Sequence, residues 1–132
     1  MQCTVGRITL VDHPTNPSLQ IGVVCGHQVV VGRHFDEGTL GFFIPAGAIV
    51  PDVLAYDMWV WGRLAGKKRN RVKVSKRDGV VSEGLFYGSR YYATSFGDDE
   101  KTYCEVPRWN MEWVEGQDVA AEVGITFQED RK

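Results

Sequence analysis

Lys76-Arg77-Asp78-Gly79 spells K-x-D-G, the pattern in which a lysine amine attacks the α-phosphate of ATP and becomes a lysyl adenylate. A lysine that forms a covalent intermediate in this way acts as a nucleophilic catalyst. The pattern is only four residues long, so it is a weak signal when taken alone. Lys76 is therefore a candidate nucleophile that needs support from the rest of the sequence.

Lys76 and Arg77 end the most basic segment of the chain, RLAGKKRNRVKVSKR, which begins at Arg63. The segment holds eight of the fifteen Lys and Arg residues and no Asp or Glu, although the net charge of the whole chain is -2. Local charge decides where a polyanion docks, because potentials are screened beyond about 8 to 10 Å at physiological salt. The segment is either a solvated loop that aids solubility or a surface that binds phosphates and releases their counterions.

Other catalytic and metal-binding patterns are weak in this sequence. Cys3, Cys25 and Cys104 are far apart and form no C-x-x-C pair, which predicts neither a disulfide framework nor a zinc knuckle and fits a reducing cytosol. Cys25 and His27 lack a second pair of metal ligands. The glycines of GRLAGKK do not have the spacing of a phosphate-binding P-loop. We expect no metal site and no cofactor.

Length and composition favour one globular domain. The chain has 132 residues, of which 43% are apolar, enough for a core without disulfides or metals. No apolar run approaches the roughly 18 residues of a membrane span, and the N-terminus lacks the pattern of a signal peptide. We expect a single soluble, cytoplasmic domain over residues 1–132 with no membrane partner.

Short apolar runs separated by turn residues predict most of the chain to be strands. β-Branched residues are concentrated in these runs, and Gly, Pro, Asn and Ser lie between them. Gly26 predicts a tight turn in a hairpin, and Pro45 ends a strand because it cannot donate to a sheet ladder. The predicted strands cover residues 3–11, the hairpin 20–32, residues 40–44, an alternating run at 72–75, and 80–88.

Two segments predict short helices. Residues 51–65 have apolar side chains at spacings near three and four, and Asp52 lies in the expected first turn. We expect Trp59 and Trp61 to pack within this helix, because indoles supply much buried area to a small core. The second helix is expected from Asp118 to Val123, where Gly124 provides a C-terminal stop.

Residues 89–110 have no clear period, and only YCEVPRW at 103–109 suggests a closing edge strand. Taken together, the elements predict an all-β domain, a small OB-like Greek-key barrel of about five to seven strands with one or two short helices. Barrel closure removes exposed sheet edges, and the OB barrel is the smallest common solution at this length. The helix at 51–65 is expected to plug an open end of the barrel.

Several motifs resemble the N-terminal OB domain of RNA ligases that join 3′-hydroxyl to 5′-phosphate ends. Those domains begin with an H-P/I-P-N-A-D-like turn, continue through V-x-G-W-x-V-V-V, and reach G-D-x-V-x-Y-x-x-x-x-x-x-L-P. The same order is found here in DHPTNPSLQIGVVCGHQVVVGRHFDEGTLGFFIPAGAIVPD. RVKVSKRDGVVSEGL is similar to their R-x-K-x-x-x-L-R-G-x-x-S-Q-G-L, and EGQDVAAEVGIT to E-G-x-D-V-x-x-x-L-G-I-T. The similarity spans nearly the whole chain. It departs at His27, where the family favours Trp, at Gly41, where it has an apolar residue, and at Glu83, where it has Gln.

The resemblance implies that the K-x-D-G pattern is a coincidence. It aligns Arg77-Asp78-Gly79 with a strand and turn, so that Lys76 and Arg77 face phosphates and Gly79 lets the backbone turn. A ligase also needs a nucleotide pocket, metal-binding carboxylates and further lysines, which its separate nucleotidyltransferase domain supplies. The chain stops where that domain would begin. We therefore expect no catalytic residue and no enzyme activity from this chain on its own.

The function implied is a non-catalytic module that binds RNA or a nicked duplex, belonging or accessory to an RNA ligase in RNA repair. Its expected partners are this nucleic acid and a nucleotidyltransferase domain in cis or in trans. The candidate nucleic-acid-binding residues are His27, Arg33, Lys67, Lys68, Arg69, Arg71, Lys73, Lys76 and Arg77. The candidate base-stacking residues are His27, Phe35, Tyr87, Tyr91 and Tyr92.

Two alternatives remain open. The first is a protein-interaction module that has lost nucleic-acid binding and docks through its apolar and acidic C-terminal half. The second is a self-adenylating ligase that uses Lys76. A preference for RNA over DNA depends on contacts to the 2′-hydroxyl that no motif here encodes.

Overall fold

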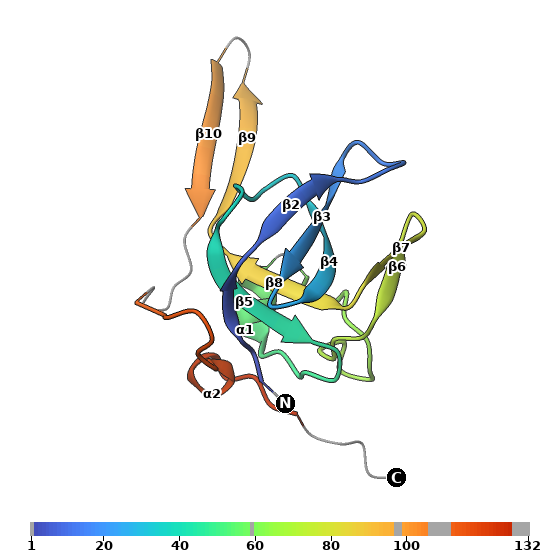
Figure 1. Ribbon diagram of the computed structural model, residues 1–132, viewed down its shortest axis with the longest axis vertical. Coiled ribbons are helices and arrows are strands. Elements are labelled where there is room, and N and C mark those ends of the chain that lie inside the picture. Colours follow the sequence, from blue (N-terminus) through green and yellow to red (C-terminus); the bar gives the residue numbers. More distant parts are fainter. Residues whose placement is uncertain (1, 59, 97–98, 106–111, 128–132) are drawn as a thin grey trace.

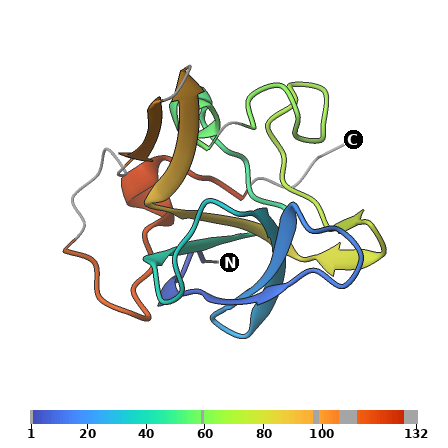
Figure 2. The same cartoon turned by 90° about the horizontal axis from the view of Figure 1, so that it is seen from above.

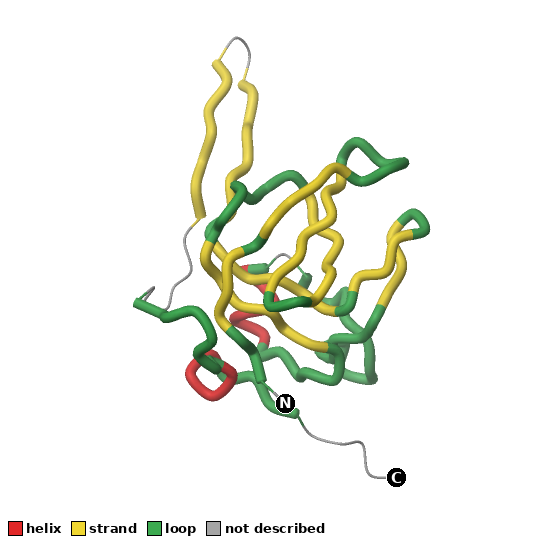
Figure 3. The backbone as a smooth tube through the Cα atoms, in the orientation of Figure 1, coloured by secondary structure: helices red, strands yellow, loops and turns green. Residues whose placement is uncertain are grey.

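The computed structural model describes residues 2–58, 60–96, 99–105 and 112–127, and within 91–96 and 99–105 it describes the backbone. The described residues form ten strands and two short helices (Figure 1). The strands are β1 (Val5–Arg7), β2 (Thr9–Asp12), β3 (Leu19–Val24), β4 (His27–Gly32), β5 (Leu40–Pro45), β6 (Ser75–Arg77), β7 (Val80–Ser82), β8 (Gly84–Gly88), β9 (Arg90–Phe96) and β10 (Asp99–Glu105), and the helices are α1 (Asp52–Asp57) and α2 (Ala120–Val123). Strands dominate the backbone (Figure 3), which confirms the predicted all-β class with one or two short helices.

The strands are antiparallel and form separate sheets. One has the order β1-β5-β8 and a second the order β2-β3-β4, while β6–β7 and β9–β10 are two-stranded hairpins. In the described part of the chain these sheets do not join into a closed barrel, and the strands outnumber the predicted five to seven. The first predicted strand is split because Ile8 donates its N–H to Thr39 and accepts from Gly38 outside both sheets.

Side chains replace part of the backbone ladder where β4 meets the β7–β8 connection. Ser82 Oγ accepts a hydrogen bond from the N–H of Val30 at 3.1 Å, and the carboxylate of Glu83 accepts from the N–H of Gln28. One backbone bond remains, from Glu83 N to Gln28 O at 2.8 Å. These contacts hold the two sheets together without continuous strand pairing, which explains why the predicted barrel is not closed.

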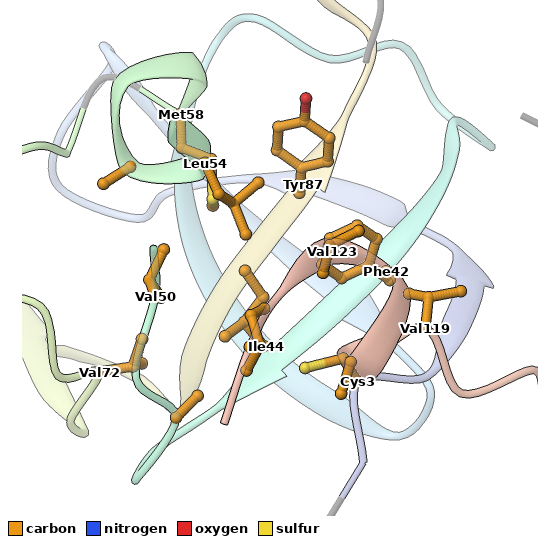
Figure 4. Close-up of a cluster of buried hydrophobic side chains, with 14 of the residues drawn as sticks. Cys3, Phe42, Ile44, Val50, Leu54, Met58, Val72, Tyr87, Val119 and Val123 are labelled. Atoms are coloured by element: carbon orange, nitrogen blue, oxygen red, sulfur yellow. The ribbon is translucent and has the colours of Figure 1, made fainter. Parts of the chain in front are cut away.

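Strand β5 separates two clusters of buried side chains. Phe42 and Ile44 belong to the larger cluster, which includes Leu54 of α1 and Val123 of α2 (Figure 4). Phe43 points to the other face, because side chains alternate along a strand, and packs in the smaller cluster with residues of β3, β4 and β8. The core therefore lies on both sides of this sheet, with the two helices on one side.

The first helix is much shorter than the predicted 51–65. Helix α1 ends at Asp57, with Met58 as its C-cap, and Gly62 lies in a turn with a φ of 74°. The prediction that Trp61 packs in this helix is wrong, because its side chain is 54% exposed and stacks on exposed Tyr56 at 5.0 Å between ring centroids. Trp59 lies outside the described residues.

The second helix is confirmed, and the two least regular segments differ from expectation. Gly124 has a φ of 81° and caps α2 directly after Val123. The predicted strand at 72–75 is wrong in its first part, because Val72 instead bonds through N–H and C=O to residues 47 and 48. Residues 103–105 of the expected edge strand lie in β10, while 106–109 lie outside the described residues. Neither described helix is long and apolar enough to cross a membrane.

The β6–β7 hairpin is fixed by a buried histidine in the 13–18 loop. His13 is only 5% exposed, and its Nδ1 accepts the N–H groups of Thr15 and Asn16 at 3.1 and 3.0 Å. Its Nε2 therefore carries the proton and donates to the carbonyl of Arg77 at 3.0 Å. The Asn16 amide also bonds the carboxylate of Asp78. This loop thus sets the position of both basic residues of β6.

We predict that Gly41→Ala lowers the free energy of unfolding by about 3 kcal/mol, at the upper end for overpacking. A Cβ at this position would lie 2.1 Å from the carbonyl oxygen of Tyr87 on β8, and backbone cannot move aside cheaply. Chemical denaturation measures the change. Val11→Ala, at a strand position that is 62% exposed, is the control and is expected to change stability by less than about 0.5 kcal/mol. Equal effects of the two substitutions would contradict this account.

We predict that His13→Ala costs about 2 kcal/mol of stability, because it leaves buried N–H groups without an acceptor. The amide protons of β6 and β7 should then exchange faster with solvent, since the tether to Arg77 is lost. Hydrogen exchange followed by NMR measures this directly. Thr15→Ala is the control, because it keeps the bond from His13 to Arg77 and removes only two long hydroxyl contacts, one of 3.4 Å to His13 Nδ1 and one of 3.5 Å to the carbonyl of Asp78. Protection that is the same in both variants would show that His13 does not hold the hairpin.

Candidate nucleic-acid interface

Three exposed cations lie at the tip of a small loop, which we call the basic tip. Ala65 and Arg71 exchange both backbone hydrogen bonds, at 2.8 and 2.9 Å, so the chain reverses between them. Within the loop, Gly66 accepts from the N–H of Arg69 at 3.1 Å, which closes a tight turn. The basic tip consists of Lys67, Lys68 and Arg69.

The basic tip is attached to the buried core. Asn70 accepts from the N–H of Val50 at 2.8 Å, and Val72 donates to the carbonyl of Ala48 at 2.9 Å. Ala48, Val50 and Val72 are all buried in the larger cluster. The loop therefore presents its cations on a support that backbone bonds and apolar packing both hold in place.

Lys76 and Arg77 point to opposite faces of the β6–β7 hairpin. Lys76 pairs with Val81 and Arg77 with Val80, and neighbouring side chains of a strand alternate between its faces. Asp78 and Gly79 connect the strands with φ values of 48° and 84°, as a two-residue type I′ turn requires. The K-x-D-G pattern is thus a strand followed by a hairpin turn. The hairpin lies on the same side of the molecule as the loop that carries the basic tip (Figures 1 and 2).

A groove of about 380 Å³ lies between strands β4 and β8 and the segment after α1, which contributes Met58, Val60, Arg63 and Leu64. Its apolar surface includes Val30, Leu85, Phe86 and Tyr87. Its basic side chains are His34, Arg63, Arg77 and Arg90, and no Asp or Glu is among the described residues that line it. The groove therefore has an apolar, aromatic surface with several basic side chains beside it.

Arg90, the first residue of β9, holds one wall of the groove in place. Its Nη1 donates to the carbonyl of Met58 at 2.8 Å, directly after helix α1. Its guanidinium carbon lies 5.9 Å from the ring centroid of Phe35, within range of a cation–π interaction. Phe35 in turn meets Phe86 edge to face, with ring centroids 5.2 Å apart. These contacts connect the end of α1 at Met58, through Arg90 and Phe35, to Phe86 of β8.

His27 and Arg33 lie outside the groove and are engaged elsewhere. The ring of His27 stacks on Phe43, with centroids 4.4 Å apart, and its Nδ1 lies 3.6 Å from the carboxylate of Glu83. The N–H of Gln28 and this histidine hold the pKa of Glu83 below its usual value, although partial desolvation opposes them. Arg33 forms a 2.8 Å ion pair with Asp12. Neither residue is among those that line the groove.

The structure divides the predicted site residues among separate surfaces. Lys67, Lys68 and Arg69 are together at the basic tip, while Lys73 and Lys76 are exposed on the segment that follows. Of the predicted cations, Arg77 alone lines the groove, and Arg71 lies at the base of the loop. Of the predicted stacking residues, Phe35 and Tyr87 line the groove, and the side chains of Tyr91 and Tyr92 lie outside the described residues.

Sequence reasoning missed three groove residues. Arg63 begins the basic segment and was available from the sequence, but neither His34 nor Arg90 carries a local signal. They reach the groove only because β4, β8 and β9 come together in the fold. In the described part of the chain, no group of three or more His, Cys, Asp or Glu residues is placed to hold a metal ion.

No family model and no curated protein matches this sequence. Its fold is similar to part of solved structures of an RNA ligase from Naegleria gruberi. The structure of that ligase with PPi has a TM-score of 0.70 and 16% identity, over 99% of this chain and 36% of the ligase. A lysine-to-alanine mutant with ATP and Mn has a TM-score of 0.68 and 18% identity, over 98% and 36%. The chain spans about a third of the length of these ligases, and at this identity the similarity establishes a shared fold.

Proposed function

We propose that this chain is a non-catalytic module that binds RNA or a nicked duplex by its phosphates. The supporting observation is the arrangement of charge on one side of the molecule. The basic tip, Lys73 and Lys76 are exposed, and none of them forms an ion pair with an Asp or Glu of the described residues. Unpaired exposed cations of this kind bind a phosphate backbone and release its condensed counterions.

The shared fold supports a role beside an RNA ligase catalytic domain. The chain is similar to about one third of an RNA ligase that has been solved with ATP and Mn. The K-x-D-G pattern here forms a hairpin turn, and Lys76 does not line the described groove. We propose that the module works with a nucleotidyltransferase domain, in cis or in trans, in RNA repair in the cytoplasm. In this arrangement the module positions the nucleic acid and the catalytic domain performs the chemistry.

Sequence-independent binding follows from the chemistry of the exposed residues. Lysine presents a hydrated point charge on a flexible stem, which suits phosphates in many positions. Contacts of this type position a nucleic acid without reading its bases. The module is therefore expected to bind different sequences with similar affinity.

We predict that the triple variant Lys73→Glu, Lys76→Glu and Arg77→Glu lowers the affinity for a nicked RNA duplex at least tenfold at about 50 mM salt. Each substitution removes a phosphate contact and adds a repulsive charge. Fluorescence anisotropy with a labelled duplex measures the affinity, and circular dichroism shows that the variant is folded.

The control compares the duplex affinities of two single charge reversals, Lys76→Glu in the basic segment and Arg7→Glu outside it. Arg7 is exposed and paired with Glu115, away from the basic segment. Its reversal should change the affinity by less than about twofold, because surface ion pairs are weak and the site is remote. Unchanged affinity in the triple variant would refute the proposed binding surface.

A further inference from the structure

We infer that the groove between residues 60–64 and strands β4 and β8 binds one unpaired nucleotide of a nucleic-acid strand. The phosphate is held by Arg63 and Arg77, and the base lies against the aromatic surface at Phe35. This inference rests on the proposed function and adds to it a second site with a different ligand. The basic tip contacts phosphates along the strand, whereas the groove accepts a single base and its phosphate.

The volume of the groove limits the class of ligand that can bind there. At about 380 Å³ it lies near the lower end of the roughly 300–1,000 Å³ typical of small-molecule sites. This space accommodates one nucleotide and excludes a base-paired duplex. A base that is paired and stacked in a helix has both faces covered by its neighbours and cannot lie against the aromatic surface of the groove, so the ligand must be unpaired.

The charges in the groove favour a phosphate. Arg63 and Arg77 both line the groove and come from different segments, one from the residues after α1 and one from β6. Neither guanidinium forms a hydrogen bond or ion pair with a side chain in the described part of the molecule. The planar fork of arginine matches the oxygens of a phosphate and binds them in a bidentate manner. Two such groups near an apolar surface attract an anion, because no carboxylate is among the described residues that line the groove.

The aromatic residues of the groove favour a base beside that phosphate. Phe35 is half-buried and is held edge to face by Phe86, while the Arg90 guanidinium lies over its ring, 5.9 Å from the ring centroid. An arginine guanidinium plane can itself stack on a base, so this group is part of the stacking surface. Tyr87 and Phe86 are buried and complete the apolar surface. A ring held in this way loses little entropy when a base stacks on it, and stacking of this kind tolerates any base.

Apart from Arg77, which lines the groove and is also replaced in the triple variant, the two sites use different residues, so single substitutions can remove one site without the other. Lys67, Lys68 and Lys76 do not line the groove, and Arg63 and Phe35 are not part of the basic tip. Arg63 is exposed, so its replacement by glutamine should leave the fold intact. The substitution Phe35→Leu keeps an apolar side chain against the smaller core cluster and removes the aromatic ring together with its contacts to Phe86 and Arg90.

The test compares a nicked RNA duplex with the same duplex carrying one unpaired nucleotide at the nick, by fluorescence anisotropy at about 50 mM salt. For the unmodified chain, the unpaired nucleotide should raise the affinity roughly tenfold. Arg63→Gln and Phe35→Leu should each remove most of this gain and change the affinity for the plain duplex by less than about twofold. Arg7→Gln, which removes an exposed arginine outside both sites, should keep the gain.

Titration with AMP, followed by NMR, locates the bound nucleotide independently of duplex binding. The amide signals of Val31, Arg63 and Tyr87 should shift, and those of Lys67 and Lys68 should not. Equal affinity for the two duplexes would overturn the inference while leaving the proposed function intact, provided that both duplexes bind. Groove shifts with AMP but no binding of either duplex would refute the proposed function and, with it, the inference for a strand, and would leave the groove as a site for a free nucleotide. AMP binding without a gain from the unpaired nucleotide would assign the groove to a free nucleotide and overturn the inference for a strand.

Discussion

Strands β5 and β8 approach so closely that Gly41 and Gly84 have no room for a side chain. A Cβ at either position would lie 2.1 Å from a carbonyl oxygen of the neighbouring strand. This close pairing makes β5 the wall between two clusters of buried side chains, with Phe42 and Ile44 on one side and Phe43 on the other. Helix α1 packs against the first cluster, and the β2-β3-β4 sheet packs against the second. The positions of both sheets therefore depend on this pair of strands.

The groove is a consequence of that arrangement. Strand β8 contributes Phe86 and Tyr87 to its surface, and β9 begins with Arg90, which bonds to the segment after α1. His13 sets the position of Arg77 from the opposite side through its bond to the backbone of β6. The basic residues of the groove thus come from segments that the two core clusters bring together. Their charge is concentrated although the chain as a whole carries a net charge of -2.

Local signals in the sequence were sufficient for much of the fold. Asp78-Gly79 adopts positive φ values and forms a hairpin turn, as this dipeptide favours, Gly26 allows the same turn after Cys25, and Gly124 ends α2 where expected. The end of α1 cannot be predicted from the spacing of apolar residues. Residues 60–65 have the same spacing of apolar side chains as a helix, but they form turns. Trp61 was expected inside the core on the basis of its type, but the short helix leaves it on the surface beside Tyr56.

The groove could not be predicted because the contacts that form it join distant parts of the sequence. Arg90 and Met58 are 32 residues apart, and His13 and Arg77 are 64 apart. The basic segment, by contrast, was visible as a run of cations, although its residues occupy two faces of a hairpin and one loop tip. The sequence shows which residues are basic, but only the fold shows which of them share a surface.

The central claim is that exposed cations on one side of this fold bind a phosphate backbone. The most direct test is the affinity of the unmodified chain for single-stranded RNA at about 50 and 200 mM salt. Counterion release by several phosphate contacts predicts that the affinity falls at least tenfold over this range. Binding that is equally tight at both salt concentrations, or no binding at either, would contradict the claim.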